Sequence, residues 1–302
     1  MEKVLLSNEE LETFKQNGYV VIKGILDSAT CKNFDRNVVQ PALFQHAGIL
    51  EDDSSTWNNS EFLKSIATAD FQKDGVLKGV MVRKHDGSDP ISDENSISLD
   101  CLNPILHQLH GGTDENPCWD WIHSNVGWIH VRFPLGETDE KYTTDSLSWH
   151  VDGGHFSPHY LESPEQSVIV LPMIRDVADG GGNTVVLKKS HIYIAQELKE
   201  AGSYGISKDI TQNLNRVAKM WPNYLIETIS PCKAGDILLM HPLLVHTAGR
   251  ALKNHPLRIA FNMGVKWKKD KLCLCDFECN QSWMEKNLVW CLNQSLDFIH
   301  EC

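Results

Sequence analysis

The sequence predicts a mostly β fold, an antiparallel sandwich or barrel with flanking helices. Short apolar runs separated by Gly, Asp and Pro fill residues 126–266, and capped amphipathic helix patterns lie on either side. Many short strands with turn residues between them are typical of such folds. No internal repeat or Gly/Ser linker divides the chain. We therefore expect a single domain over 1–302, with a helical part about 1–120, the core about 126–266 and a C-terminal helix about 282–300.

The N-terminal region predicts helix, strand and helix in turn. Ser7 is expected to cap a helix from Asn8 to Gln16, because Glu10 stands where a capping box needs it. Tyr19–Ile22 is rich in β-forming residues and predicts a strand. A second helix is expected over residues 27–39, and a strand is possible from 77 to 83.

The core is expected to contain eight strands. A polar, partly helical insert at 191–222 interrupts them as a lid or side-packing element. The runs that predict strands are Gly127–Phe133, Leu147–Val151, Ser167–Ile174, Asn183–Leu187, Leu225–Ile229, Ile237–Met240, Leu243–His246 and Leu257–Val265.

Composition excludes several classes of protein. A hydrophobic content of 41% with 23% charged residues is that of a globular chain and excludes global disorder. The net charge of −12 argues against a nucleic-acid or anionic-membrane binder, which needs a basic face. No apolar stretch approaches the ~20 residues of a membrane span. With no secretory signal pattern at Met1–Val4, we expect a cytoplasmic protein whose partner is a small molecule.

Nine cysteines form an odd set, and reduced thiols are the expected state in a cytoplasmic protein. The one cluster is Cys273, Cys275 and Cys279. These thiolates can hold Zn²⁺ if Cys291 or a histidine supplies a fourth ligand. Their spacing is not that of an ordinary zinc motif, so free thiols are the favoured interpretation.

The most informative segment contains His150 and Asp152. Residues two apart on a strand point to the same face, so this imidazole and this carboxylate can converge on one point. Two such groups are two of the three members of a facial triad. That triad suits Fe(II), because three protein ligands leave three adjacent positions open for substrate and oxygen.

His246 is the candidate third ligand. It follows a Gly-Asp turn and a buried apolar run, at the start of the next expected strand. Arg258 lies twelve residues further on and shares one strand face with Ala260 and Asn262. A guanidinium inside a barrel needs an anion, and its fork matches a carboxylate. An iron triad with an inward arginine is what a 2-oxoglutarate site requires.

Five further residues are candidates for contacts in this site. Thr184 can donate to 2-oxoglutarate, and His130 can line the co-substrate pocket. Arg132, His155 and Arg83 are candidates for binding an acidic substrate, although each is also compatible with an ordinary surface or structural role.

Four segments resemble the phytanoyl-CoA dioxygenase-like family. They are Tyr19–Gly24 after a Phe-containing helix, the His150-x-Asp152 pair, Gly180–Thr184 leading to Ser190-His191, and His241–His246. The resemblance implies a double-stranded β-helix, a jelly-roll or cupin-like barrel. It also implies Fe(II) on His150, Asp152 and His246, and 2-oxoglutarate chelating the iron with its distal carboxylate on Arg258.

The function implied is an Fe(II)- and 2-oxoglutarate-dependent dioxygenase that uses O2 and releases succinate and CO2. We expect it to oxidise a C–H bond of a small carboxylate- or amino-acid-like metabolite, by hydroxylation, desaturation or ring closure. An acyl-CoA substrate is disfavoured, because no basic patch for the CoA phosphates is evident. The alternatives are a non-enzymatic metal- or ligand-binding jelly roll, an acyl-CoA hydroxylase, and a zinc hydrolase with the same three ligands. The zinc hydrolase leaves Arg258 unexplained.

Overall fold

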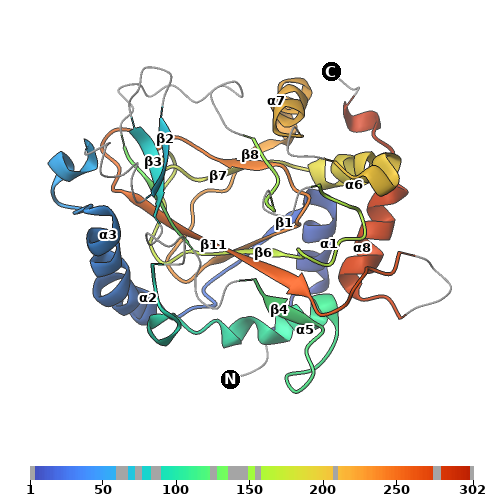
Figure 1. Cartoon of the computed structure of the whole chain (residues 1–302), viewed down its shortest axis with the longest axis horizontal. Helices are drawn as coiled ribbons and strands as arrows, with labels where there is room; N and C mark the ends of the chain where they lie inside the picture. Colours follow the sequence, from blue (N-terminus) through green and yellow to red (C-terminus); the bar gives the residue numbers. More distant parts are fainter. Residues whose placement is uncertain are drawn as a thin grey trace.

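The fold combines helices with two antiparallel sheets (Figure 1). The structure is a computed structural model that describes residues 4–58, 67–71, 77–82, 90–122, 128–134, 149–153, 158–206, 210–274 and 280–299. Helices are a larger part of it than a mostly β fold implies, so that expectation is corrected to a mixed architecture.

The strands are short except for the last. They are β1 (Tyr19–Ile22), β2 (Ala67–Phe71), β3 (Leu77–Val82), β4 (Trp119–Trp121), β5 (Trp128–Arg132), β6 (Ile169–Pro172), β7 (Thr184–Leu187), β8 (Ile226–Thr228), β9 (Ile237–Met240), β10 (His246–Ala248) and β11 (Arg258–Trp267).

The helices lie at the sides of these sheets in Figure 1. The α-helices are α1 (Asn8–Asn17), α2 (Ser28–Phe34), α3 (Gln40–Ala47), α5 (Asn103–His110), α6 (Ser190–Ala201), α7 (Ile210–Met220) and α8 (Trp283–Leu292). A π-helical segment, Asp35–Val39, joins α2 to α3. The described residues also form short 3₁₀-helices at Ser54–Asn58, Asp93–Asn95, Asp100–Leu102, Gly202–Tyr204, Asn223–Leu225 and Asp297–Ile299.

The larger sheet has the order β1-β9-β6-β11-β5-β3-β2, with β4 also paired to β11. The smaller sheet has the order β10-β7-β8. The strand pairs of both sheets are antiparallel, as the sequence predicted. Because β11 lies between β6 and β5 in the middle of the larger sheet, its backbone pairs with a strand on each edge.

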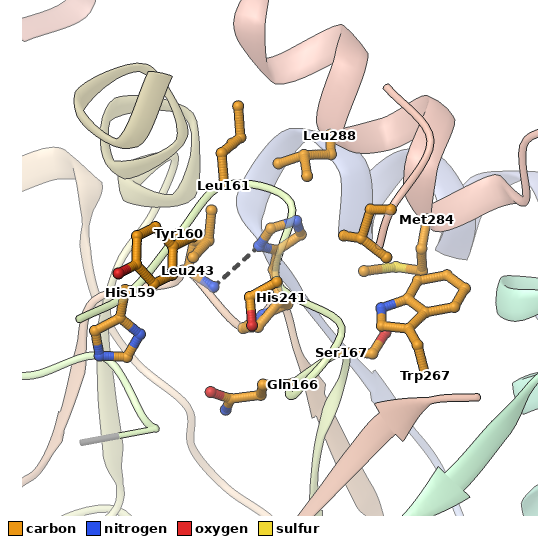
Figure 2. Close-up of a pocket in the computed structure, with 13 residues that line it drawn as sticks. His159, Tyr160, Leu161, Gln166, Ser167, His241, Leu243, Trp267, Met284 and Leu288 are labelled. Carbon is orange, nitrogen blue, oxygen red and sulfur yellow. Dashed lines mark hydrogen bonds between the residues drawn. The ribbon is translucent and has the colours of Figure 1, made fainter. Parts of the chain in front are cut away.

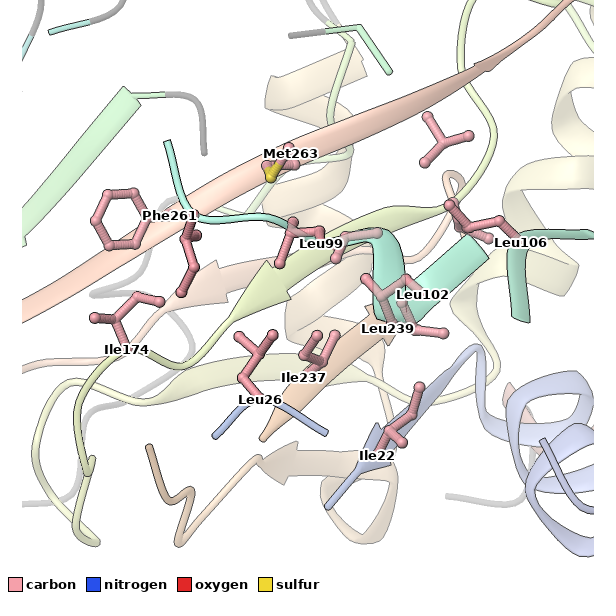
Figure 3. Packing of buried hydrophobic residues seen from close by; sticks show 14 of the residues in the cluster. Ile22, Leu26, Leu99, Leu102, Leu106, Ile174, Ile237, Leu239, Phe261 and Met263 are labelled. Carbon is pink, nitrogen blue, oxygen red and sulfur yellow. The ribbon is translucent and has the colours of Figure 1, made fainter. Parts of the chain in front are cut away.

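The two faces of β11 carry different chemistry. Ile259, Phe261 and Met263 are buried in the main core, which packs the sheet against the helices (Figure 3). Strand alternation places Arg258, Ala260 and Asn262 on the opposite face. The polar face of β11 is therefore directed away from the main core.

The two sheets meet at the face of the larger sheet that is opposite the main core. A separate buried cluster joins Ile169 and Leu238 of the larger sheet to Val186 of β7 in the smaller one. Val185 and Leu187 point the other way, into a cluster with α6 and α7 that also contains Trp149. The smaller sheet is thus covered by helices outside and faces the larger sheet inside.

The capping signals are confirmed. Ser7 Oγ accepts from the Glu10 backbone N–H at 3.2 Å, and Glu10 accepts from the Ser7 N–H at 2.8 Å. Ser282 and Glu285 form the same box at the start of α8. The sequence reasoning did not identify β2, β4 or α5. In the described part of the chain, no helix is long and apolar enough to cross a membrane.

The cysteines depart from expectation at one place. Cys31, Cys101, Cys118, Cys232 and Cys291 are free thiols, as predicted. Cys273 is disulfide-bonded, so the expectation of reduced thiols is wrong for that residue. Cys275 and Cys279 lie outside the described residues. A disulfide at Cys273 also excludes the alternative of a zinc-binding thiolate there, because the ligand must be a deprotonated thiol.

Candidate metal centre

His150, Asp152 and His246 come together in the structure. Their ligand atoms all lie within 4.8 Å of one another, and they are the one such group of metal-ligating side chains among the described residues. Asp152 Oδ1 is 3.5 Å from His150 Nε2 and 3.7 Å from His246 Nε2. Two imidazoles and one carboxylate in this arrangement match the facial triad of non-haem Fe(II) sites.

Backbone pairing brings the two histidines side by side. The N–H of His150 donates to the carbonyl of His246 at 3.0 Å, and the reverse bond is 2.9 Å. The ring centroids are 4.4 Å apart. Because Asp152 follows His150 by two residues, its carboxylate reaches the same point. The pair of backbone hydrogen bonds therefore fixes the triad's geometry.

Neighbouring groups orient the ligand atoms. His246 Nδ1 lies 2.9 Å from the Leu244 carbonyl, which only accepts, so Nδ1 carries the proton and Nε2 keeps its lone pair for a metal. Asp152 Oδ2 accepts a hydrogen bond of 2.7 Å from Asn262 Nδ2. Each of these two ligands is thus turned toward the centre by a second group.

The electrostatics of the triad favour metal-ligating protonation states. Burial, assisted by the charge of His150, lowers the pKa of His246 to about 4, so its ring is neutral at neutral pH. Burial alone would raise the pKa of Asp152. Attraction to His246 and His150, with hydrogen bonds from His150 and Asn262, outweighs burial and holds that pKa well below its usual value. A neutral imidazole and an ionised carboxylate are the forms that bind metals.

Arg258 reaches from the larger sheet to the smaller one. Its Nη2 donates to Thr184 Oγ1 at 3.2 Å, and both residues are buried. No described carboxylate pairs with this guanidinium, and its Nε is buried without a partner among the described residues. Burial, and then repulsion from Arg132, lowers the pKa of Arg258 to about 10, so it stays charged. A buried, incompletely bonded cation is a site for an anion.

The register of β5 and β11 places the other candidates. Arg132 is the direct partner of Arg258, and His130 is the partner of Ala260. Burial, and then the charge of Arg132, lowers the pKa of His130 to about 4. The charge of Asp152 raises the pKa of His130, and the charge of Arg258 lowers it. Neutral His130 therefore lies between the triad and the arginine pair.

Two of the predicted site residues, Arg83 and His155, lie outside the described residues. His241 is buried and accepts at Nδ1 from the Leu243 N–H at 3.1 Å, as Figure 2 shows. It lines a small, mostly apolar cavity of about 50 Å³ with His159, and no member of the triad lines this cavity. His241 therefore has the core-packing role expected for it.

Asn262 is a candidate functional residue that the sequence reasoning placed on a strand face without assigning it a role. Its position on the polar face of β11, four residues after Arg258, is the sequence signal. Its bond to Asp152 could not be read from that signal, because it depends on how the segment containing Asp152 lies over β11.

The chain matches one family of known proteins. The model of the phytanoyl-CoA dioxygenase (PhyH) family matches residues 14–258, which confirms the resemblance seen in the motifs. No curated protein matches the sequence.

Solved structures of 2-oxoglutarate-dependent enzymes are among those similar to this chain. The epimerase SnoN in complex with Fe3+, alpha ketoglutarate and nogalamycin RO is 14% identical, with a TM-score of 0.53, over 85% of this chain and 82% of that one. The carbocyclase SnoK from nogalamycin biosynthesis is 14% identical, with a TM-score of 0.49, over 86% and 84%. HygX from Streptomyces hygroscopicus, with nickel, 2-oxoglutarate and hygromycin B bound, is 14% identical, with a TM-score of 0.45, over 94% and 100%. The match of the family model over most of the chain shows that the protein belongs to the phytanoyl-CoA dioxygenase family of 2-oxoglutarate-dependent non-haem iron oxygenases.

Proposed function

We propose that the protein oxidises a C–H bond of a small, carboxylate- or amino-acid-like metabolite by hydroxylation, desaturation or ring closure. The observation that carries the site assignment is the line of groups from the triad to Arg258. Asn262, Ala260 and Arg258 share one face of β11, and Asn262 is bonded to Asp152. Four residues of a strand span about 13 Å, a distance that a chelating dicarboxylate and an arginine side chain can bridge.

His150, Asp152 and His246 are the proposed ligands of Fe(II). The donor set fits: one ionised carboxylate and two imidazoles, with Nε2 of His246 kept unprotonated by the Leu244 carbonyl. Iron with 2-oxoglutarate and O2 supplies the oxidising power, and succinate and CO2 are the by-products. The chain's own contribution is to hold the ligands, the co-substrate and the substrate in register.

Arg258 and Thr184 are the proposed holders of the distal carboxylate of 2-oxoglutarate. The guanidinium has unused donors, and the Thr184 hydroxyl, which accepts from Arg258, can donate onward to the same carboxylate. His130, neutral and across from Ala260, is proposed to flank the co-substrate.

Arg132 remains a candidate for substrate binding, together with His155 and Arg83. Its register beside Arg258 favours a position at the co-substrate's distal end over one above the metal. The net charge of −12 is compatible with a small anionic substrate only where such local cations gather, and it argues against a CoA ester.

We also infer a single domain over 1–302, with the two facing sheets forming a double-stranded β-helix.

The site assignment is tested by anaerobic spectroscopy. Fe(II) with 2-oxoglutarate is expected to give a weak visible charge-transfer band in the native protein. Asp152→Ala and His246→Ala are expected to abolish it, and Asp270→Ala, at an exposed position, is the matched control that keeps it. A band that survives loss of either ligand would contradict the assignment.

The substrate class is tested separately. Each member of a panel of amino acids and small carboxylates is incubated with the iron-loaded enzyme, and succinate release is measured. The product mass then separates a gain of one oxygen atom from a loss of two hydrogen atoms. Stimulation by acyl-CoA esters alone would overturn the proposed class.

A further inference from the structure

The two carboxylate oxygens of Asp152 have different surroundings. Oδ1 lies 3.5 Å from His150 Nε2 and 3.7 Å from His246 Nε2, so it faces the point where the imidazoles converge. Oδ2 accepts the 2.7 Å hydrogen bond from Asn262 Nδ2. One oxygen is therefore directed to the metal position, and the other is already engaged.

Asn262 is firmly placed to make this bond. Its neighbours Phe261 and Met263 are buried in the main core, and Met263 pairs with Val170 of β6. Its other edge pairs with Trp128 of β5. Because Asn262 pairs with one strand and the next residue pairs with another, the Asn262 backbone has little freedom to follow Asp152 if the carboxylate turns. The hydrogen bond to a charged acceptor is also stronger than one between neutral groups.

The hydrogen bond between Asn262 and Asp152 affects how many coordination positions remain open on the metal. A six-coordinate ion uses three positions for the triad, and 2-oxoglutarate chelating through two oxygens uses two more. One position then remains. A carboxylate that bound through both oxygens would occupy it, and carboxylates do bind metals in either mode.

We propose that Asn262 is a positioning residue that holds Asp152 as a one-oxygen ligand and so keeps the last coordination position open. The proposal rests on the proposed metal and 2-oxoglutarate site. It assigns to Asn262 a role in setting the coordination number, separate from any role in folding or in contacting substrate.

The test counts open positions without turnover. The protein is loaded with Mn(II), and water-proton relaxivity, which reports exchangeable waters on the metal, is measured before and after 2-oxoglutarate is added. In Asn262→Leu, which keeps the volume and removes the donor, the inner-sphere relaxivity is expected to fall by about one third without 2-oxoglutarate and to be nearly lost with it. Mn(II) affinity is expected to be equal or tighter, because the carboxylate then contributes two bonds.

Two further variants separate this role from a structural one. Asn262→Gln keeps an amide donor and is expected to recover most of the open position. Asn293→Leu makes the same change at a residue whose amide bonds within α8, and is expected to leave relaxivity unchanged. Thermal unfolding of each variant shows whether it is folded. If Asn262→Leu does not fold, Asn262→Val, which also removes the donor and suits a strand, is expected to show the same loss.

Native relaxivity in folded Asn262→Leu or Asn262→Val, at saturating Mn(II) and 2-oxoglutarate, would overturn the role of Asn262. A different result would contradict the proposed metal and co-substrate site. If the native protein binds no Mn(II) at a single site, or if 2-oxoglutarate does not lower its relaxivity, then the proposed metal and co-substrate site is wrong.

Discussion

Arg132 and Arg258 are direct partners across the antiparallel β5–β11 pair. Like charges opposite each other on a sheet are destabilising, and here the repulsion helps burial to lower the pKa of Arg258 to about 10. The cost is offset when an anion lies between or beside the two guanidinium groups. The distal carboxylate of 2-oxoglutarate, proposed above to bind at Arg258, would supply such an anion, and the neighbouring charge of Arg132 would strengthen its binding.

Replacing each arginine by methionine should separate the two contributions. Arg258→Met removes a buried charged donor, a loss of about 1.5–3 kcal/mol, and should raise the Kd of 2-oxoglutarate about 10- to 150-fold. Arg132→Met relieves the repulsion as well as removing attraction, so its effect should be under about tenfold. Anaerobic titration of the charge-transfer band gives both Kd values, and the reverse order would contradict the proposed binding of the distal carboxylate at Arg258.

Ala260 lies between Arg258 and Asn262 on the polar face of β11, opposite His130. The proposed position of the co-substrate requires this small side chain, so Ala260→Leu should impair 2-oxoglutarate binding by about 1–3 kcal/mol, the usual cost of overpacking. The metal ligands are untouched, and Mn(II) affinity should stay within about twofold. Ala29→Leu at an exposed position of α2 is the matched control for the substitution. Weaker Mn(II) binding with normal 2-oxoglutarate affinity would place the co-substrate elsewhere.

The sequence predicted what depends on local pattern. The alternation of Arg258, Ala260 and Asn262, the capping box at Ser7 and the His150-x-Asp152 spacing all follow from period and local chemistry. Relationships between distant strands were not predictable in this way. The register of each strand pair and the sheet to which a strand belongs depend on which strands become neighbours. The side-chain contacts between strands depend on the same choice.

The short strands show the same limit. β4 has three residues and β2 is a strand at the sheet edge, so neither carries a strong alternating pattern. The Arg258–Thr184 bond crosses from one sheet to the other, and no local signal reports such a contact. The disulfide at Cys273 was missed because cysteine state was inferred from the expected compartment.

Gly18 closes α1 with φ of +83°, a conformation that favours glycine. A Cβ there would lie 2.6 Å from His191 Nδ1 and 2.7 Å from Leu244 Cδ1. Gly18→Ala should therefore lower the free energy of unfolding by about 2–4 kcal/mol, from backbone strain and overpacking together. Gly24→Ala is the matched control, because Gly24 has φ of +60° and a Cβ added to it would meet nothing within 4 Å. Its cost should be about 1–2 kcal/mol, and equal losses in urea titrations would exclude the packing contribution.

His110 ties α5 to the segment before β6. Its Nδ1 donates to the Leu106 carbonyl at 2.8 Å, which leaves Nε2 to accept from the Ser167 hydroxyl at 2.6 Å. Burial lowers the pKa of His110 to about 4, against an ordinary value of 6.5. The folded protein therefore keeps this ring neutral in a pH range where the unfolded chain protonates it.

The stability of the protein should consequently fall as the pH is lowered from 6.5 to 4, the window between the unfolded and folded pKa values of His110. The contribution is fully present above pH 6.5, and on the order of 3 kcal/mol is lost by pH 4. His110→Phe should reduce the slope of unfolding free energy against pH by up to one proton, measured by urea titration at several pH values. Ser167→Ala removes a hydrogen bond but leaves the ring buried, so it should lower stability by about 1 kcal/mol at every pH without changing the slope. A slope in His110→Phe equal to that of the native protein would show that other groups, such as buried His191, carry the acid sensitivity.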